Sequence, residues 1–260
     1  MTESYRIQSR SVFFDGFDGS RLAGTLDFPS EITPSQYAII SHCFTCTRQT
    51  ITTARLSRGL AQAGIAVLRF DFTGLGESEG AFADSNFSSM VKDIECAAGF
   101  LAEHYQAASL LLGHSMGGTA SLLASQTGFG ALAQVRRLVT LASPAYPAHV
   151  LHHFGSVMQS LEQGEAAEIM VAGQAYPIKP SFVEDVRNFD MKASMSSCEI
   201  PVMAVRAGND ALIGPEAAEQ VLELTQGEKK LLQIDGADHL FSDRKHAAEL
   251  LSGVESWVAG

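Results

Sequence analysis

A serine framed by glycines is the residue of this chain best placed for covalent chemistry. Ser115 lies at the centre of Gly-His-Ser-Met-Gly, after the apolar run 110–112 and before small and apolar residues at helical spacing. A serine at the apex of a sharp strand-to-helix turn exposes its Oγ, and glycines two residues either side let the neighbouring backbone pass close. The pattern predicts a nucleophile for acyl transfer, with an ordinary tight turn as the alternative.

A serine hydroxyl is a poor nucleophile at neutral pH, so it needs a histidine base that is oriented by a carboxylate. His239 is the expected base, because it follows the predicted strand 230–234. Asp210 is the expected acid, because it follows the predicted strand 202–205. Groups placed after parallel strands meet at the carboxyl edge of the sheet, and the chain order Ser, Asp, His is typical of an α/β-hydrolase.

Other interpretations of these two residues stay open at this point. Asp210 precedes a predicted helix, where a solvated turn carboxylate is common, and His239 could be a histidine of a surface loop. Asp235 and Asp238 are competing acids, but side chains so near His239 in the sequence would reach its ring with difficulty. The spacing therefore favours Asp210.

An acyl-transfer site also needs donors for the developing oxyanion. We expect the backbone N–H of Met116 to be one donor and that of Phe44, in the loop 42–46 after an apolar strand, to be the other. His42 opens this loop, and its simplest role is to pack and hydrogen-bond so that the loop is held. His114 lies inside the elbow, where we expect it to support the nucleophile.

The substrate is expected between the elbow and an insertion at about 145–199, which interrupts the strand and helix alternation. Insertions of this size between core strands are more often lids than separate domains. The insertion mixes apolar side chains with histidines, and an apolar-lined pocket would favour an acyl or aryl group. We group five side chains as the expected substrate surroundings: His42, His114, His152, His153 and Met158.

Cys43 and Cys46 form a C-x-x-C pair after a strand and before a helix, which is also the arrangement of thioredoxin-like redox sites. A structural or incidental pair is the favoured interpretation, and the four cysteines match no disulfide framework. No second Cys or His pair completes a metal site, so no metal and no cofactor are expected. Asp71 and Glu77 are expected to organise a loop, with a catalytic carboxylate pair as the alternative.

The elements that must position these residues alternate along the chain. An antiparallel hairpin within 11–28 comes first, and near-continuous apolar strands then alternate with helices, which predicts an α/β fold with a parallel sheet covered on both faces. The predicted strands are 37–42, 65–71, 110–112, 135–142, 201–208 and 230–234. The predicted helices are 48–63, 88–105 (capped by Ser88), 118–127, 215–224 and 242–257. Within the insertion we expect a helix at 149–163, a hairpin at 168–178 and a helix near 182–188.

Length and composition exclude several classes of protein. The 260 residues suffice for one large α/β domain, and we expect 1–260 to form that domain, because nothing resembles a linker. A formal net charge of −11 argues against a nucleic-acid partner. No apolar run approaches the roughly 20 residues of a membrane span, and the N-terminus lacks the pattern of a secretory signal, so a cytoplasmic location is expected. The sequence does not indicate an oligomeric state.

Taken together, the motifs Gly-His-Ser115-Met-Gly, Asp71-Phe-Thr-Gly-Leu-Gly-Glu-Ser78, Gly-Asn-Asp210 and Gly-Ala-Asp-His239 resemble a serine hydrolase of the α/β-hydrolase superfamily, near the serine aminopeptidase and lysophospholipase-like members. The resemblance covers essentially the whole chain and implies a mostly parallel eight-stranded sheet with a small lid. More narrowly, the runs 41–46 and 68–80 and the insertion's hairpin are similar to the hydrolase half of proteins fused to an OsmC-like domain. Relatives near here usually have glycine where Cys43 stands.

The expected activity is the cleavage of carboxylic esters through an acyl-enzyme, with a small acyl ester as substrate. A cofactor-free perhydrolase, a C–C hydrolase or an acyltransferase would use the same triad. A C-x-x-C redox protein and a non-catalytic binding protein are further alternatives. No OsmC-like half is present in these residues, so such a domain is expected, if anywhere, on a separate partner chain.

Overall fold

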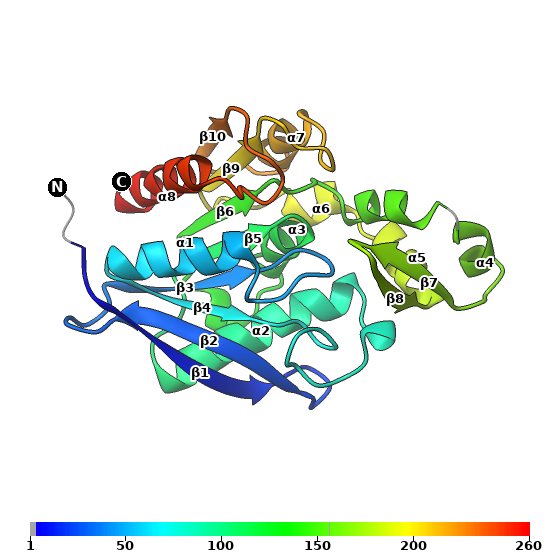
Figure 1. Cartoon of the computed structure of the whole chain (residues 1–260), viewed down its shortest axis with the longest axis horizontal. Helices are drawn as coiled ribbons and strands as arrows, with labels where there is room; N and C mark the ends of the chain where they lie inside the picture. The colour runs from blue at the N-terminus through cyan, green and yellow to red at the C-terminus, as the bar shows by residue number, and fades with distance from the viewer. Residues whose placement is uncertain (1–3, 156) are drawn as a thin grey trace.

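The structure, a computed structural model that describes residues 4–155 and 157–260, is built on one eight-stranded sheet (Figure 1). Its strand order is β1-β2-β4-β3-β5-β6-β9-β10, with β1 and β2 antiparallel to their neighbours and the other strands parallel. This confirms the predicted α/β class and the mostly parallel eight-stranded sheet. The strands are β1 (Ile7–Asp15), β2 (Arg21–Pro29), β3 (Gln36–Ser41), β4 (Ile65–Phe70), β5 (Leu110–His114), β6 (Arg137–Leu141), β9 (Val202–Ala207) and β10 (Lys229–Ile234).

Helices cover both faces of the sheet, because the central strands are apolar on both sides. The α1 (Ile51–Gln62) and α8 (Arg244–Ala259) helices pack on one face, over a core that includes Ile40, Leu112 and Val139. The α2 (Phe87–His104), α3 (Met116–Ala124) and α7 (Ala217–Glu223) helices pack on the other face, over the alternate side chains of the same strands. Strand side chains alternate between faces, so one apolar run serves both cores.

The insertion between β6 and β9, which we call the lid, lies largely at the end of the molecule opposite both chain termini, on the right of Figure 1. It contains the 3₁₀ segment η3 (Pro147–Phe154), helices α4 (Met158–Glu162), α5 (Pro180–Arg187) and α6 (Met191–Met195), and a hairpin of β7 (Ala167–Val171) and β8 (Gln174–Ile178). The hairpin forms a separate two-stranded sheet, as predicted for 168–178. Two further 3₁₀ turns lie outside the lid, at η1 (Phe82–Asp84) and η2 (Gly130–Leu132).

The prediction of a single helix at 149–163 was wrong. That segment holds η3 and the short α4 on either side of the exposed Gly155, and residue 156 of the predicted helix lies outside the described residues. A glycine inside a helix costs about 1 kcal/mol relative to alanine, which favours a break at this position. The α6 helix was not predicted.

The cap predicted for the helix at 88–105 was also wrong. The Asn86 side-chain oxygen accepts a hydrogen bond from the Ser89 backbone N–H at 2.9 Å, and the Ser89 hydroxyl accepts one from the Asn86 backbone N–H at 2.8 Å. This reciprocal pair is a capping box that starts α2. Ser88 instead donates from its amide and its hydroxyl to Asp185, which fastens α2 to the lid helix α5.

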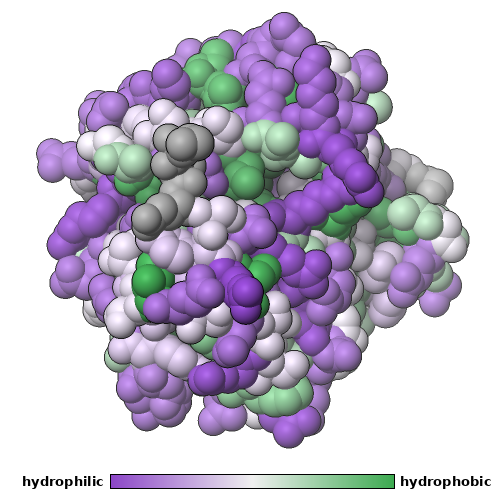
Figure 2. All heavy atoms as spheres, turned by 60° about the vertical axis from the view of Figure 1, so that its left-hand side comes forward, coloured by the Kyte–Doolittle hydropathy of each residue, from purple (hydrophilic) through white to green (hydrophobic). Residues whose placement is uncertain are grey.

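The surface drawn in Figure 2 is mostly hydrophilic, with apolar side chains scattered among polar ones. Among the described residues, no helix combines the length and the hydropathy that crossing a membrane requires.

Candidate active site

Ser115 occupies the sharp turn between β5 and α3, as its flanking glycines predict. Its backbone has φ 53° and ψ −127°, a left-handed conformation that a residue with a Cβ rarely adopts. The glycines make this turn possible: a Cβ on Gly113 would lie 2.4 Å from the Gly117 carbonyl oxygen, and one on Gly117 would lie 2.3 Å from that of His42. The Ser115 amide is held by the Leu141 carbonyl at 2.8 Å.

Asp210 and His239 are hydrogen-bonded to each other in the loops that follow β9 and β10. The His239 Nδ1 donates to Asp210 Oδ2 at 2.7 Å, and the side chains are 12% and 4% exposed. The other carboxylate oxygen accepts the amides of Leu212 and Ile213 at 2.8 and 3.0 Å. Burial alone would raise the Asp210 pKa, but these bonds and the nearby imidazole hold it below its ordinary value. The carboxylate therefore stays ionised and aimed at the ring.

His114 supports the loop that carries His239. Its Nε2 lies 2.8 Å from the His239 carbonyl oxygen, and the two rings are 4.7 Å apart. The side chain is fully buried, and burial lowers the pKa of His114 to about 3, with a smaller contribution from the neighbouring His239 ring. The ring is therefore neutral near pH 7 and donates from Nε2, which fixes the backbone that carries His239.

The loop after β3 is held by His42 and by a disulfide. His42 is completely buried, its Nδ1 lies 2.7 Å from the Cys43 carbonyl oxygen, and its Nε2 accepts the Phe72 amide at 3.3 Å. Burial lowers the His42 pKa to about 4, so the neutral ring donates from Nδ1 and accepts at Nε2. Within the described residues, neither the Phe44 amide nor the Met116 amide has a hydrogen-bond partner.

Cys43 and Cys46 are joined by a disulfide, and Cys96 and Cys198 are free. The expectation that the cysteines match no disulfide framework was therefore wrong for this pair. The two residues are the ends of a turn closed by a Cys46 N–H to Cys43 carbonyl hydrogen bond of 3.2 Å, and their Cα atoms are 5.2 Å apart. That separation lies in the usual range for a disulfide.

Arg48, which the sequence analysis did not single out, holds Asp71 and Glu77 together. The guanidinium of this buried residue contacts both carboxylates, and its amide donates to Asp71 Oδ1 at 2.6 Å. Asp71 also accepts the Glu77 amide at 3.0 Å. The two carboxylates thus organise the loop after β4.

A cavity of about 550 Å³ opens above the elbow. Its wall comes from five places: the disulfide loop, the elbow, the lid, the loop after β9 and the loop after β10. The lining residues are Cys43, Phe44, Thr45, Cys46, Ser115, His153, Val171, Ala172, Gln174, Tyr176, Asn209, Ala211, Leu212, Asp238, His239 and Leu240. Ser115 and His239 share this cavity, while Asp210 lies behind His239.

The cavity is lined by only part of the group of five side chains that we expected around the substrate. His153 lines it, whereas His152 is exposed on η3 and bonds the His149 carbonyl oxygen through Nδ1 at 2.6 Å. The Met158 sulfur lies 3.8 Å from Arg187 Nη2 and is not part of the lining, and the buried His42 and His114 are not part of it either. A substrate contact by these four stays a prediction.

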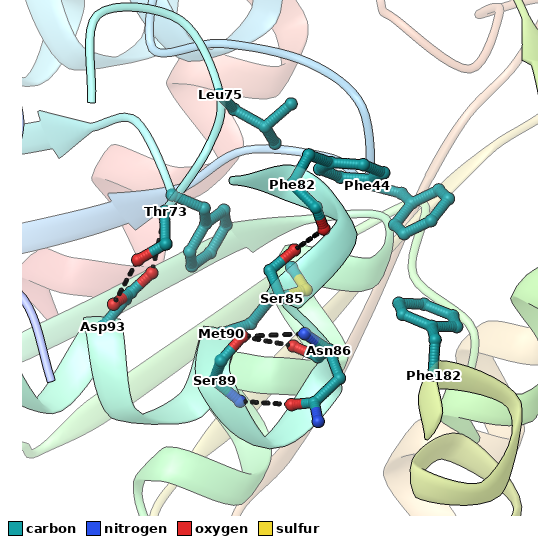
Figure 3. Close-up of a pocket in the computed structure, with 11 residues that line it drawn as sticks. Phe44, Thr73, Leu75, Phe82, Ser85, Asn86, Ser89, Met90, Asp93 and Phe182 are labelled. Carbon is teal, nitrogen blue, oxygen red and sulfur yellow. Dashed lines mark hydrogen bonds between the residues drawn. The ribbon is translucent and has the colours of Figure 1, made fainter. Parts of the chain in front are cut away.

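The Phe44 ring belongs to an aromatic cluster that includes residues of the lid. Its ring centroid lies 5.6 Å from that of Phe82, 6.3 Å from that of Phe154 and 5.2 Å from that of Phe182. Figure 3 shows Phe44, Phe82 and Phe182 of this cluster beside a small hollow of about 10 Å³, with Asp93 bonded to Thr73 at its far end. The lid therefore packs directly on the residue expected to donate to the oxyanion.

The hairpin contributes cavity residues that the sequence analysis expected only as apolar side chains of the insertion. The Tyr176 hydroxyl donates to the Thr45 carbonyl at 3.0 Å, which joins β8 to the disulfide loop across 131 positions of sequence. The hairpin itself was readable from its alternation, but nothing in the sequence indicated its partner. Apart from residues 1–3 and 156, the chain presents no group of three His, Cys, Asp or Glu side chains arranged to hold a metal ion.

Comparison with known proteins places this chain among hydrolases. The family described as "Serine aminopeptidase, S33" matches residues 39–180. Among solved structures, the esterase domain of a Rhodothermus marinus protein is 32% identical, with 96% of this chain and 97% of that chain covered and a TM-score of 0.76. No curated protein matches the sequence.

Two more distant structures share the fold. Est1E from Butyrivibrio proteoclasticus, solved with ferulic acid bound, is 21% identical over 95% of this chain and 98% of its own, with a TM-score of 0.78. Alpha/beta hydrolase domain-containing protein 10 from mouse is 18% identical over 96% of this chain and 98% of its own, with a TM-score of 0.77. The predicted α/β-hydrolase fold is confirmed. The similarity to OsmC-fused hydrolases, and an OsmC-like partner, stay predictions.

Proposed function

Because this chain belongs to the S33 serine aminopeptidase family of the α/β-hydrolase superfamily, we propose that it is a serine hydrolase that cleaves carboxylic esters through an acyl-enzyme. One observation carries the proposal: the Asp210–His239 hydrogen bond of 2.7 Å lies behind the cavity that Ser115 and His239 both line. A strained serine, a base oriented by a carboxylate and a substrate-sized cavity are the components of acyl transfer.

In the first step, Ser115 Oγ attacks the ester carbonyl carbon while His239 Nε2 takes the hydroxyl proton. Asp210 keeps the imidazole in the required tautomer and stabilises the imidazolium that forms. The alkoxide oxygen is stabilised by the amides of Phe44 and Met116, which have no other partner among the described residues. Collapse of the tetrahedral intermediate breaks the C–O bond, and His239 gives its proton to the departing alcohol.

In the second step, His239 removes a proton from a water molecule that attacks the acyl-enzyme. The carboxylic acid leaves and the Ser115 hydroxyl is restored. His42 and His114 stay neutral throughout, since burial lowers the pKa of both, so neither competes with His239 as a base near pH 7.

The walls of the cavity favour an ester with an apolar acyl or aryl group. Val171, Ala172, Leu212 and Leu240 present aliphatic surface to it, and these residues come from the lid and the two triad loops. The esterase domain from Rhodothermus marinus, at 32% identity over nearly the whole chain, supports the choice of an ester over an amide.

Covalent labelling by a fluorophosphonate tests the proposal. We expect the wild type to label at Ser115 and to hydrolyse aryl esters, and Ser115→Ala to lose labelling and about 10⁶-fold in kcat. Ser181→Ala, at an exposed lid serine, is the matched control and should behave as wild type. Equal labelling of wild type and Ser115→Ala would contradict the assignment of the nucleophile.

Product analysis on aryl esters of graded acyl length then identifies the reaction. Release of the free carboxylic acid in proportion to the alcohol supports hydrolysis, and activity that peaks for an acyl chain filling the cavity supports an apolar acyl pocket. Acid release that falls well below alcohol release when another acceptor is supplied would indicate acyl transfer instead.

A further inference from the structure

The loop that carries Phe44 is a disulfide-closed turn. Cys43 and Cys46 occupy its first and fourth positions, Phe44 and Thr45 its centre, and the Cα atoms of the two cysteines are 5.2 Å apart. The Cys46 amide donates to the Cys43 carbonyl at 3.2 Å across the same turn. One covalent bond and one hydrogen bond therefore hold the same two residues together.

The Cys43 carbonyl determines where the Phe44 amide points. That carbonyl accepts from His42 Nδ1 at 2.7 Å and from the Cys46 amide at 3.2 Å, which fixes the plane of the peptide between Cys43 and Phe44. In a planar trans peptide the N–H points opposite to the C=O. The Phe44 N–H is thus held in one direction without any hydrogen bond of its own among the described residues.

The disulfide is placed where a small reductant can reach it. Both cysteines line the cavity that also holds Ser115, and Cys46 is half-buried while Cys43 is only 7% exposed. The free Cys198 is buried and Cys96 is half-buried, and neither belongs to that lining.

We propose that the Cys43–Cys46 disulfide is a redox modification site that sets the esterase activity: the oxidised turn holds the Phe44 amide toward the oxyanion, and reduction releases it. The proposal rests on the proposed function, because it assigns a role to the disulfide only if Ser115 performs acyl transfer.

The reductant is a small dithiol. Its thiolate attacks the more exposed Cys46 Sγ, the S–S bond breaks, and Cys43 leaves as a thiolate that takes a proton. The second thiol of the reductant then displaces Cys46 from the mixed disulfide and forms a cyclic disulfide. Two electrons and two protons pass to the protein, which ends with two thiols. Without the covalent link, the Cys46 amide no longer has to stay under the Cys43 carbonyl, and one of the two restraints on the peptide plane weakens.

Reversible reduction of the folded chain tests the proposal. The oxidised protein is treated with dithiothreitol, freed of it anaerobically, assayed on an aryl ester, and then reoxidised with an excess of oxidised glutathione. Thiols titrated in denaturant should rise from two to four and return to two. We expect reduction to lower kcat at least ~10-fold, but by no more than the ~10²- to 10³-fold that loss of a whole oxyanion donor costs. KM should change less than about twofold. Reoxidation should restore kcat.

Two variants separate the disulfide from the other cysteines. Cys46→Ser should show the low kcat of the reduced chain and no response to dithiothreitol. Cys96→Ser, the matched control, keeps the disulfide and should respond as wild type. If Cys46→Ser misfolds, the reversible reduction of the wild type still tests the proposal.

Either of two results would overturn the proposal: four titratable thiols with kcat unchanged, or two thiols that never increase while the chain is folded. Loss of fluorophosphonate labelling in the oxidised wild type is a different failure, because it would reject the proposed function itself.

Occupancy of the cavity gives a further check. A phosphonate bound covalently to Ser115 should slow the reduction of the disulfide, because both cysteines line the space that the adduct fills. An unchanged reduction rate would contradict access through the cavity.

Discussion

At the scale of single residues, His42 shows how a buried neutral imidazole can position a backbone group. Both ring nitrogens are used, one toward the Cys43 carbonyl and one toward the Phe72 amide, and the pKa lowered to about 4 by burial keeps the ring uncharged. The sequence suggested only that His42 packs and holds the loop. The geometry adds which peptide it holds, the one that contains the Phe44 amide.

Replacing His42 separates positioning from packing. We expect His42→Ala to lower kcat about 10- to 100-fold with little change in KM, because the Cys43 carbonyl loses a donor and the peptide plane loosens. His42→Asn, which can offer an amide N–H in place of Nδ1, should recover most of that loss. Steady-state kinetics on an aryl ester measure both. An asparagine variant no better than alanine would show that the donor is not what matters.

At the scale of elements, the loop after β4 is fastened to α2 by one buried carboxyl group. Asp93 accepts the Thr73 amide at 2.9 Å and the Thr73 hydroxyl at 3.1 Å, as Figure 3 shows. Burial raises the pKa of Asp93 to about 7, the Thr73 bonds oppose that rise, and the neighbouring Asp18 adds to it. Asp93 is 1% exposed as a whole residue, so ionisation of its carboxyl group is costly.

This shift gives a pH dependence with a definite sign. A raised folded-state pKa means that the folded chain keeps a proton that the unfolded chain has lost, so stability falls as pH rises from about 4 to about 7. Asp93→Asn removes the ionisation. Its carbonyl oxygen can still accept the Thr73 amide, and its NH₂ group can donate to the Thr73 hydroxyl, with the direction of that bond reversed. We expect the variant to gain about 2–3 kcal/mol in unfolding free energy relative to wild type between pH 5 and pH 8. Urea unfolding at the two pH values measures it, and a constant difference between the proteins would contradict the assignment.

At the scale of the whole molecule, a buried ion pair joins the antiparallel edge of the sheet to its centre. Asp27 on β2 accepts Arg69 Nε of β4 at 2.7 Å and also the hydroxyls of Ser9 on β1 and Ser57 on α1. Asp27 and Arg69 are 0% and 1% exposed. A buried pair of this kind contributes little net stability when intact, but removing one partner leaves an uncompensated charge.

Single and double replacements of this pair should therefore differ. Asp27→Ala should lower the free energy of unfolding by about 3–5 kcal/mol, because the Arg69 guanidinium loses its counter-charge inside the fold. Asp27→Ala combined with Arg69→Met should cost clearly less than the sum of the two single changes. Urea unfolding measures all three, and strict additivity would show that the two side chains do not interact.

Local sequence patterns were enough to predict the sheet, the turn at Ser115 and the loops that carry Asp210 and His239. Apolar runs of strand length, turn residues and the glycines around Ser115 act through neighbours in the chain, so their consequences can be read locally. The eight strands were placed within a few residues. The pairing of Asp210 with His239 followed because both residues come directly after parallel strands, whose carboxyl ends lie at one edge.

The surroundings of that edge depend instead on contacts between segments that lie far apart in the sequence. The Tyr176 bond to Thr45, the Ser88 bonds to Asp185 and the Arg48 clamp on Asp71 and Glu77 join residues that no local pattern relates. The cavity wall depends on how the lid packs against Phe44, and the split at Gly155 alters that lid. Such contacts form because buried polar groups must be hydrogen-bonded and apolar surfaces must be shielded from water. Many different side chains could satisfy either requirement. Which of them did was settled by the packing of the whole chain.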